Sequence, residues 1–403
     1  MIGAGGRRVG ATSSRRQSWT RHVLDATLTA DQTLLARSVR EFAERELRPN
    51  VRAWDDAQRF PHELLPKLAE LGLMGIQIPE AYGGAGMSAL DYCLALEELA
   101  RVDPSIALSV AAHNGLGTAH LAMFGSEAQK QRYVVPLAQG RTLAAWGLTE
   151  AGSGSDAAAM RTTAVRDADG WVLNGVKQFI SGAGSSSYYI VMARTADTGN
   201  RGITAIVVPS DTPGLSFGPN EKKMGWNAQP TRQVIFDNVR VPIANRLGEE
   251  GSGFGIAMKG LNGGRINMGA CSLGGGQAAL DKSVAYLKER EAFGGPLINQ
   301  QSLLFQLADM ETELVTARTL LWRAADALDR GAPDAVKLCA MAKRVATDAG
   351  FNVANSAIQL HGGYGYLSEY GLEKIARDLR VHQILEGSNE IMRLIIGRIV
   401  AGT

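Results

Sequence analysis

The pattern of apolar residues changes twice along this chain of 403 residues, and this order constrains the fold more than any other feature. Apolar side chains recur at helical spacing from about residue 28 to residue 140, as in Leu35, Val39 and Phe42 behind a TADQ capping box. Short β-branched and aromatic runs then take over, and the helical period returns from Gly253 to the end. We therefore predict an α+β protein with an N-terminal all-α domain (27–145), a middle antiparallel β domain (146–250) and a C-terminal helical domain (251–403).

Four runs predict the main strands of the middle domain. Gly, Pro, Asn or Asp lies between the runs, as expected for turns between neighbouring strands. The runs are WVLNGVKQFIS (171–181), YYIVMART (188–195), GITAIVVP (202–209) and RQVIFDNVRVP (232–242).

The first 26 residues have a different composition. They contain five arginines, no acidic residue before Asp25, and many Ser, Thr and Gly. This predicts a basic flexible tail, with a mitochondrial transit peptide as the alternative. The three cysteines are far apart and form no CxxC, which is typical of reduced thiols in an intracellular protein. Bacterial cytoplasm is the favoured compartment, and the mitochondrial matrix is the alternative.

Several functional classes are disfavoured by the sequence. A formal net charge of +2 argues against nucleic acid and membrane surfaces as partners, and no apolar run approaches the roughly 18 residues of a membrane span. The six histidines form no HxxxH or HExxH pair, so we expect no metal site. The chain has no GxSxG motif, no P-loop and no complete dinucleotide fingerprint. The glycines between 260 and 276 fall in a helical region, where we expect them to allow close approach of another helix or a ligand.

One carboxylate is in an unusual position. The stretch VHQILEGSNEIM (381–392) places Glu386 between two apolar groups, which we expect to be buried. A carboxylate there must be solvated, paired or used. Its simplest explanation is a favourable interaction with the dipole of the helix that begins near Ser388. A mostly apolar pocket would instead raise its pKa and make it a better base.

Seven motifs in order resemble those of the acyl-CoA dehydrogenase family, over about residues 28–400. They are LTEAGSGSD (148–156), KQFISGAG (177–184), KMGWNAQPTRQVIFDNVRVP (223–242), GLNGGRINMGACSLG (260–274), EREAFGGPL (289–297), QLHGGYGY (359–366) and RVHQILEGSNEIMR (380–393). The resemblance implies the three domains already predicted, with a four-helix bundle as the C-terminal domain. It also implies a homotetramer that binds FAD without a Rossmann unit.

The resemblance implies a set of flavin contacts from two subunits. One subunit would supply Leu148, Thr149, Ser155, Phe179, Ile180 and Ser181, together with Ser388 and Glu390 next to the base. The neighbouring subunit would supply Arg290, Phe293, Gln301, Gln359 and Gly363. Phe179 and Ser181 stand where many members have Trp and Thr, and Ala292 replaces a common hydroxyl residue. An isolated arginine such as Arg290 is otherwise often just a solvated charge at a helix end.

The resemblance also implies the substrate site and the base. It places the catalytic glutamate at Glu386, with Ser155, Asn262, Arg265 and Gly387 as contacts of the acyl-CoA thioester. Asn262 stands where many relatives have Asp, and Arg265 could instead form a salt bridge at a helix start. Some members carry the base just before this arginine, a position occupied here by Gly264. Trp226 either helps to wall the site or packs in the core.

The expected reaction is FAD-dependent α,β-dehydrogenation of a short branched acyl-CoA, isobutyryl-CoA first, with an electron-transfer flavoprotein as the electron acceptor. A butyryl-CoA or 2-methylbutyryl-CoA substrate is the nearest alternative, because one methylene changes binding by only about 1–3 kcal/mol. A flavin-free scaffold that keeps the fold and an oxidase that uses O₂ are alternatives from other classes.

Overall fold

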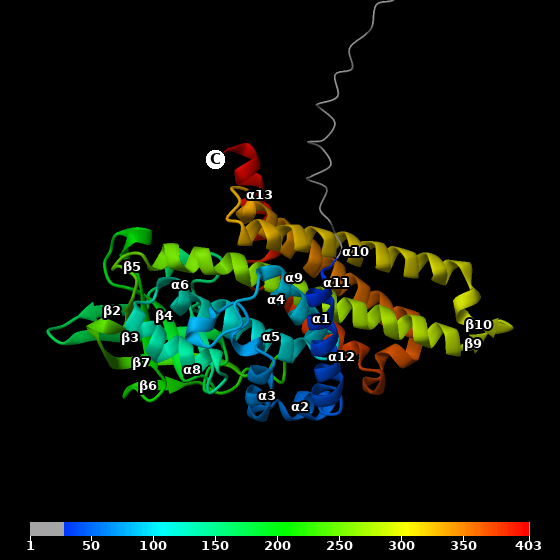
Figure 1. Cartoon of the computed structure of the whole chain (residues 1–403), viewed down its shortest axis with the longest axis horizontal. Coiled ribbons are helices and arrows are strands. Elements are labelled where there is room, and N and C mark those ends of the chain that lie inside the picture. Colours follow the sequence, from blue (N-terminus) through cyan, green and yellow to red (C-terminus); the bar gives the residue numbers. More distant parts are fainter. Residues whose placement is uncertain (1–27, 403) are drawn as a thin grey trace, which may run out of the picture.

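The computed structural model describes residues 28–402, so the predicted basic tail lies outside the described residues. A helical part, a sheet and a second helical part follow one another along the chain, as Figure 1 shows. This confirms the predicted α+β class and the order of its parts.

Short helices form the first part, and side-chain caps begin several of them. Thr29 and Gln32 form the predicted capping box of α1, and Ser88 caps α4 together with Asp91. These helices are α1 (Ala30–Phe42), α2 (Val51–Ala57), α3 (Leu65–Glu70), α4 (Ala89–Ala100), α5 (Pro104–Ala112), α6 (Ala119–Phe124), α7 (Glu127–Gln129) and α8 (Val135–Ala138).

The middle part is a sheet of eight strands in the order β6-β7-β3-β2-β4-β5-β8, with β1 beside β4. The four predicted runs are β3, β4, β5 and β7, and most pairings are antiparallel. Two pairings are parallel, β1 with β4 and β2 with β4, so the sheet is mixed at this place. The strands are β1 (Ala144–Gly147), β2 (Thr163–Arg166), β3 (Gly170–Ser181), β4 (Tyr188–Arg194), β5 (Ile203–Pro209), β6 (Leu215–Phe217), β7 (Thr231–Pro242) and β8 (Arg246–Leu247).

Three long helices dominate the last part, and the shorter α12 packs against α9 and α11. A two-stranded hairpin joins α9 to α10, and α13 projects from the body at the C-terminal end (Figure 1). The elements are α9 (Gly253–Glu289), β9 (Glu291–Ala292), β10 (Gly295–Pro296), α10 (Gln301–Asp329), α11 (Ala335–His361), α12 (Leu372–Arg380) and α13 (Asn389–Ala401).

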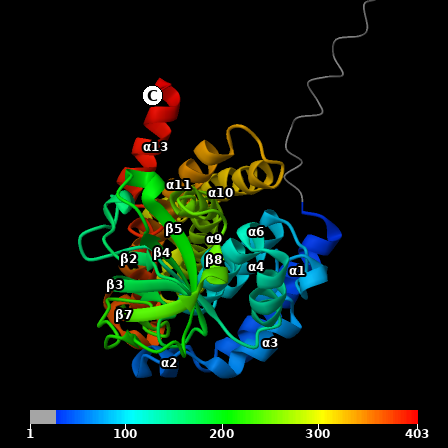
Figure 2. The same cartoon turned by 90° about the vertical axis from the view of Figure 1, so that its left-hand side faces the viewer.

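Helix α9 connects all three parts. It begins against β5 and runs through the molecule to the hairpin at the far end, while α4 packs beside it and α1 lies on the other side of α4 in the turned view (Figure 2). Its glycines allow this packing: a β-carbon at Gly275 would lie 2.9 Å from Leu379, and one at Gly276 would lie 3.0 Å from Gly350. The predicted use of these glycines for close approach is confirmed, and α4, α9, α10 and α11 share one apolar core.

Candidate active site

Glu386 lies in a short irregular segment between α12 and α13. It adopts a left-handed backbone conformation with φ 57°, and Gly387 follows with φ 87°. Only glycine adopts this region freely, so the conformation of Glu386 is strained and must be stabilised by its surroundings. The Ser388 hydroxyl then accepts a hydrogen bond from the Ile391 N–H and begins α13, as the sequence predicted.

The apolar groups on either side of Glu386 are not both buried within one chain. Ile384 is 55% exposed and Leu394 is 45% exposed, so the prediction of two buried faces is wrong for the single chain. Helical spacing identifies the apolar side of α13, but α13 projects outward (Figure 1), and Ile399 and Val400 near its end are 45% and 73% exposed.

Glu386 as a whole residue is partly accessible, but part of its carboxylate is enclosed. Its Oε2 atom is buried and has no hydrogen-bond partner within residues 28–402. Burial raises the pKa of Glu386 to about 7, while the positive charges of Arg265 and Lys343 act in the opposite direction. The result is a carboxylate that can take up and release a proton near neutral pH.

Gly264 provides the space that the carboxylate occupies. A β-carbon at Gly264 would lie 2.8 Å from the carboxyl carbon of Glu386, and closer still to Oε2. The next residue, Arg265, is 5% exposed and donates a 2.8 Å hydrogen bond from Nη1 to Asn262 Oδ1. Arg265 lies well inside α9, so the alternative of a salt bridge at a helix start is wrong. Asn262, Arg265 and Gly387 thus lie around the Glu386 carboxylate.

A second group of expected residues lies where β1 and β3 end. The buried ammonium of Lys177 donates to Leu148 O at 3.0 Å and to Glu150 Oε1 at 2.7 Å. The Gln178 N–H donates to Thr149 O at 2.8 Å, so the loop after β1 runs beside β3. Ser155, on the same loop, is exposed.

Phe179 has an unusual conformation for a strand residue. The β3–β7 register shifts between Lys177 and Ile180, and Phe179 lies in this bulge with φ 58° and 61% of its surface exposed. Ile180 is buried and directs its side chain into the core, while Ser181 is partly accessible. An outward aromatic face beside hydroxyl groups fits the planar ring of a flavin.

The remaining expected cofactor residues lie elsewhere in the chain. From Gly264 to Arg290, α9 continues for about 26 residues, which is about 39 Å of helix. Arg290 lies over the Tyr364 ring, with 5.6 Å between its guanidinium carbon and the ring centroid, close to Gly363. Phe293, at the hairpin tip, is 90% exposed, and Gln301, Gln359 and Gly363 are also exposed. One chain therefore does not bring these five residues to Glu386, whereas Ser388 and Glu390 lie next to it.

Sequence reasoning missed polar residues on α11 that contact the segment around Glu386. Lys343 donates to Gly387 O at 2.9 Å, and Asp348 accepts hydrogen bonds from residues on both sides of Glu386. One feature of the sequence could have identified Lys343. It lies among the apolar positions of α11, four residues after Cys339 and three before Ala346. Trp226 is buried and donates from Nε1 to His382 Nε2 at 3.2 Å, so it belongs to the core and does not wall the site.

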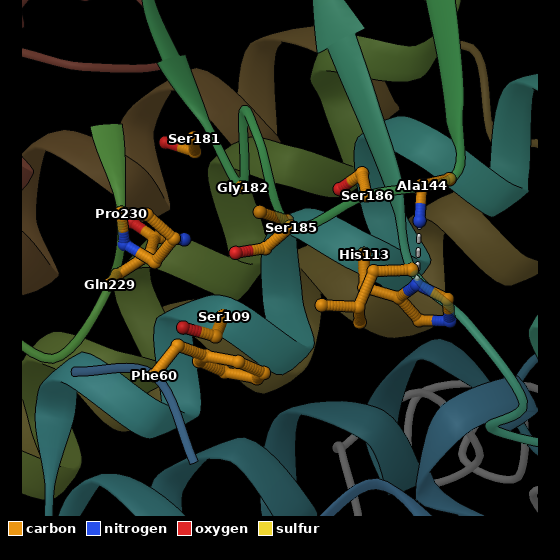
Figure 3. Close-up of a pocket in the computed structure, with 12 residues that line it drawn as sticks. Phe60, Ser109, His113, Ala144, Ser181, Gly182, Ser185, Ser186, Gln229 and Pro230 are labelled. Atoms are coloured by element: carbon orange, nitrogen blue, oxygen red, sulfur yellow. Dashed lines mark hydrogen bonds between the residues drawn. The ribbon is translucent and has the colours of Figure 1, made fainter. Parts of the chain in front are cut away.

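A cavity of about 20 Å³ lies between the N-terminal helices and the sheet, as Figure 3 shows. It has room for about one water molecule. Ser181 lines it together with Ser109, His113 and Gln229, but Glu386 and Arg265 do not. Burial lowers the pKa of His113 to about 4, so the imidazole is neutral and accepts a hydrogen bond from the Ala144 N–H. The cavity and the surroundings of Glu386 are therefore two separate places in the fold.

No helix within residues 28–402 is long and apolar enough to cross a membrane. The same residues contain no group of three or more His, Cys, Asp or Glu side chains that could hold a metal ion.

Comparisons with known proteins agree on one family. The family models for the acyl-CoA dehydrogenase N-terminal, middle and C-terminal domains match residues 29–141, 145–239 and 251–401. The mitochondrial isobutyryl-CoA dehydrogenase of Bos taurus is 49% identical over 371 residues, which are 92% of this chain and 89% of that protein.

Two solved structures resemble the whole fold. Butyryl-CoA dehydrogenase from Megasphaera elsdenii has a TM-score of 0.91 and 41% identity, and the match covers 94% of this chain and 100% of that one. A chain from a structure described as the electron transferring flavoprotein of Acidaminococcus fermentans has a TM-score of 0.92 and 41% identity, over 94% of this chain and 99% of that one. With all three domains matched in order, the chain belongs to the acyl-CoA dehydrogenase family.

Proposed function

We propose that this FAD-dependent acyl-CoA dehydrogenase oxidises a short branched acyl-CoA, isobutyryl-CoA first, with Glu386 as the catalytic base. The observation that carries the proposal is the buried Glu386 Oε2, which has no hydrogen-bond partner within residues 28–402 and faces Gly264. A carboxylate kept in this state is suited to accept a proton from a bound ligand. The 49% identity to an isobutyryl-CoA dehydrogenase supports the acyl group.

In the proposed reaction the proton on the α carbon of the thioester moves to Glu386, and the α,β double bond forms as the β hydrogen leaves with its electron pair. The bound flavin supplies the oxidising power by accepting that hydride at N5. The carbonyl oxygen gains negative charge as the proton leaves. The Glu386 N–H donates to no acceptor within residues 28–402 and is available to this oxygen.

The charges around the base suit this step. Arg265 is buried and directly follows Gly264, the glycine that faces the carboxylate. Lys343 reaches the site from α11. Both cations stabilise negative charge at the site. This charge is first on the carboxylate and then on the thioester oxygen, once the proton has moved from the α carbon to Glu386. Asn262 orients the guanidinium of Arg265 through their 2.8 Å hydrogen bond.

We further propose that FAD binds across two subunits of a homotetramer. Leu148, Thr149, Ser155, Phe179, Ile180 and Ser181 of one subunit would contact the flavin end, with Ser388 and Glu390 near the base. Arg290, Phe293, Gln301, Gln359 and Gly363 would come from the neighbour. About 39 Å of helix between Gly264 and Arg290 supports this division, because one extended cofactor would not reach both groups within one chain. The reduced flavin would pass its electrons to an electron-transfer flavoprotein, a partner supported by the family.

The test is an anaerobic titration of the purified yellow protein with isobutyryl-CoA and butyryl-CoA, followed by the flavin absorption band. We expect isobutyryl-CoA to bleach the band at the lower concentration. Bleaching by butyryl-CoA alone would overturn the substrate and favour the second candidate, a butyryl-CoA dehydrogenase, which the 41% identity to the Megasphaera enzyme supports.

Glu386→Gln tests the base. We expect this variant to keep FAD and lose flavin reduction by several orders of magnitude, while Glu369→Gln, an exposed acid in the same domain, behaves like the wild type. Near-normal reduction in Glu386→Gln would overturn the assignment.

A further inference from the structure

The residues that flank Glu386 form a short segment, 383–389, here called the base segment. It begins at the last residue of a 3-10 turn and ends at the first residue of α13. Within it, Glu386 and Gly387 are consecutive left-handed residues, with φ 57° and 87°. A left-handed glutamate is an unfavourable conformation, of order 1–3 kcal/mol. The base segment therefore needs external contacts to keep this conformation.

One carboxylate oxygen joins the two ends of the base segment. Asp348 Oδ1, on α11, accepts a 2.7 Å hydrogen bond from Gln383 Nε2 and a 2.8 Å hydrogen bond from Asn389 Nδ2. Gln383 and Asn389 lie three residues before and three residues after Glu386. Asp348 thereby closes the base segment into a loop with Glu386 at its centre.

The same helix also contacts the middle of the loop. Lys343, fully buried, donates to Gly387 O at 2.9 Å and to Asn389 Oδ1 at 2.8 Å. Thr347 Oγ1 accepts a 3.0 Å hydrogen bond from Asn389 Nδ2. Since α11 is a continuous helix of 27 residues, these three side chains form a rigid frame for the base segment.

We propose that Asp348 is a positioning residue for the dehydrogenation: by joining Gln383 to Asn389 it keeps Glu386 in the left-handed conformation that directs its carboxylate toward Gly264. The inference rests on the proposed role of Glu386 as the base. Among the described residues 28–402, the Asp348 carboxylate bonds only side chains of the base segment, so it acts through Glu386 and does not contact the reacting atoms.

The expected kinetic effect is a loss of kcat. A misplacement of about 1 Å can reduce a rate about 100-fold, whereas ligand contacts made by Asn262 and Arg265 would remain. We expect Asp348→Ala to lower the rate of flavin reduction about 10- to 100-fold and to change KM by less than about threefold. Asp348→Asn keeps an oxygen acceptor in the same place, so we expect it to recover most of the rate.

The measurement combines stopped-flow flavin reduction with hydrogen–deuterium exchange of the peptide that contains residues 383–389, on the FAD-loaded enzyme. Asp55→Ala is the matched control, because Asp55 is a buried carboxylate that bonds Arg377 on α12 at 2.9 Å and does not touch the base segment. We expect faster exchange of this peptide in Asp348→Ala and unchanged exchange in Asp348→Asn and Asp55→Ala.

The outcomes separate the two proposals. Wild-type exchange and kcat in Asp348→Ala, with Glu386→Gln inactive, would overturn the positioning role and leave the base assignment intact. An equal loss of kcat in Asp55→Ala would also overturn the positioning role, because it would indicate a general loss of structure. Normal turnover in Glu386→Gln would overturn the assignment of Glu386 as the base, whatever the result for Asp348→Ala.

Discussion

Gly264 and Glu386 face each other across the candidate site, and the absence of a side chain at Gly264 is what leaves room for the carboxylate. A β-carbon there would lie 2.8 Å from the carboxyl carbon of Glu386. This distance is far below van der Waals contact, so one of the two groups would have to move.

Gly264→Ala therefore displaces the base without adding a polar group. We expect flavin reduction to fall about 100-fold, because a base moved by about 1 Å loses its alignment with the α proton. Gly263→Ala is the matched control, since a β-carbon at Gly263 meets no atom within 4 Å. Equal rates in the two variants, at equal flavin content, would contradict the proposed location of the base.

The pH dependence of flavin reduction follows from the Glu386 pKa of about 7. The base acts in its ionised form, so we expect the rate to rise with pH and to level off above about pH 7. Lys343→Met removes a cation that lowers this pKa, so we expect the rising limb to move to higher pH. Lys337→Met, on the same helix, is the control and should leave the limb in place. If the rate of flavin reduction rises over the same pH range in Lys343→Met as in the wild type, a group other than Glu386 controls that rise.

Glu386 also links stability to pH. In the folded protein Glu386 keeps its proton up to about pH 7, whereas in the unfolded chain it releases the proton near the ordinary pKa of a glutamate, 4.5. The free energy of unfolding therefore falls as pH rises through this window. We expect Glu386→Gln to be more stable than the wild type at pH 8, by about 1–2 kcal/mol because the residue is partly accessible, and equally stable below about pH 4.5. Thermal unfolding at pH 8 and pH 4.5 measures the difference, and a variant less stable at pH 8 would contradict the enclosed carboxylate.

Arg290→Gln tests the division of the cofactor site between subunits. If Arg290 pairs with a phosphate of a cofactor bound mainly by the neighbour, we expect the purified variant to lose FAD on dialysis while its helices stay folded. Arg330→Gln, an exposed residue that pairs with Asp326 in the same domain, is the control. Equal FAD retention in the two variants would leave Arg290 as a solvated charge at a helix end.

Sequence patterns predicted most of the fold because they report local structure. Capping residues such as Thr29 and Ser88 fix helix starts through contacts within one turn, and the runs that became β3 and β7 match the strands nearly to the residue. The parallel pairing of Ala144 with Tyr188 was missed, because strand direction depends on contacts distant in the sequence.

The site was only partly predictable from local patterns. The position of Glu386 between apolar residues identified it as unusual, but the polar partners of its segment come from α11, about 40 residues away in the chain. Nothing near Asp348 or Lys343 in the sequence shows that they reach residues 383–389. The left-handed Phe179 could not be predicted either, since its φ is imposed by the shift of register between β3 and β7.

A buried ion cluster lies away from Glu386. The Lys374 ammonium donates to Asp103 Oδ1 at 2.8 Å and to Asp378 Oδ2 at 2.7 Å, and all three residues are buried. Lys374→Met leaves two carboxylates without their cation, so we expect the free energy of unfolding to fall by about 3–5 kcal/mol. The loss should be larger at pH 8 than at pH 5, because burial already raises the pKa of Asp378 and the variant can neutralise its carboxylates by protonation at the lower pH. Urea denaturation at both pH values measures the loss.

Lys67→Met is the control, because it breaks a surface pair with Glu46 and should cost less than about 1 kcal/mol. A similar small loss in Lys374→Met would show that the buried cluster contributes no more than a surface pair.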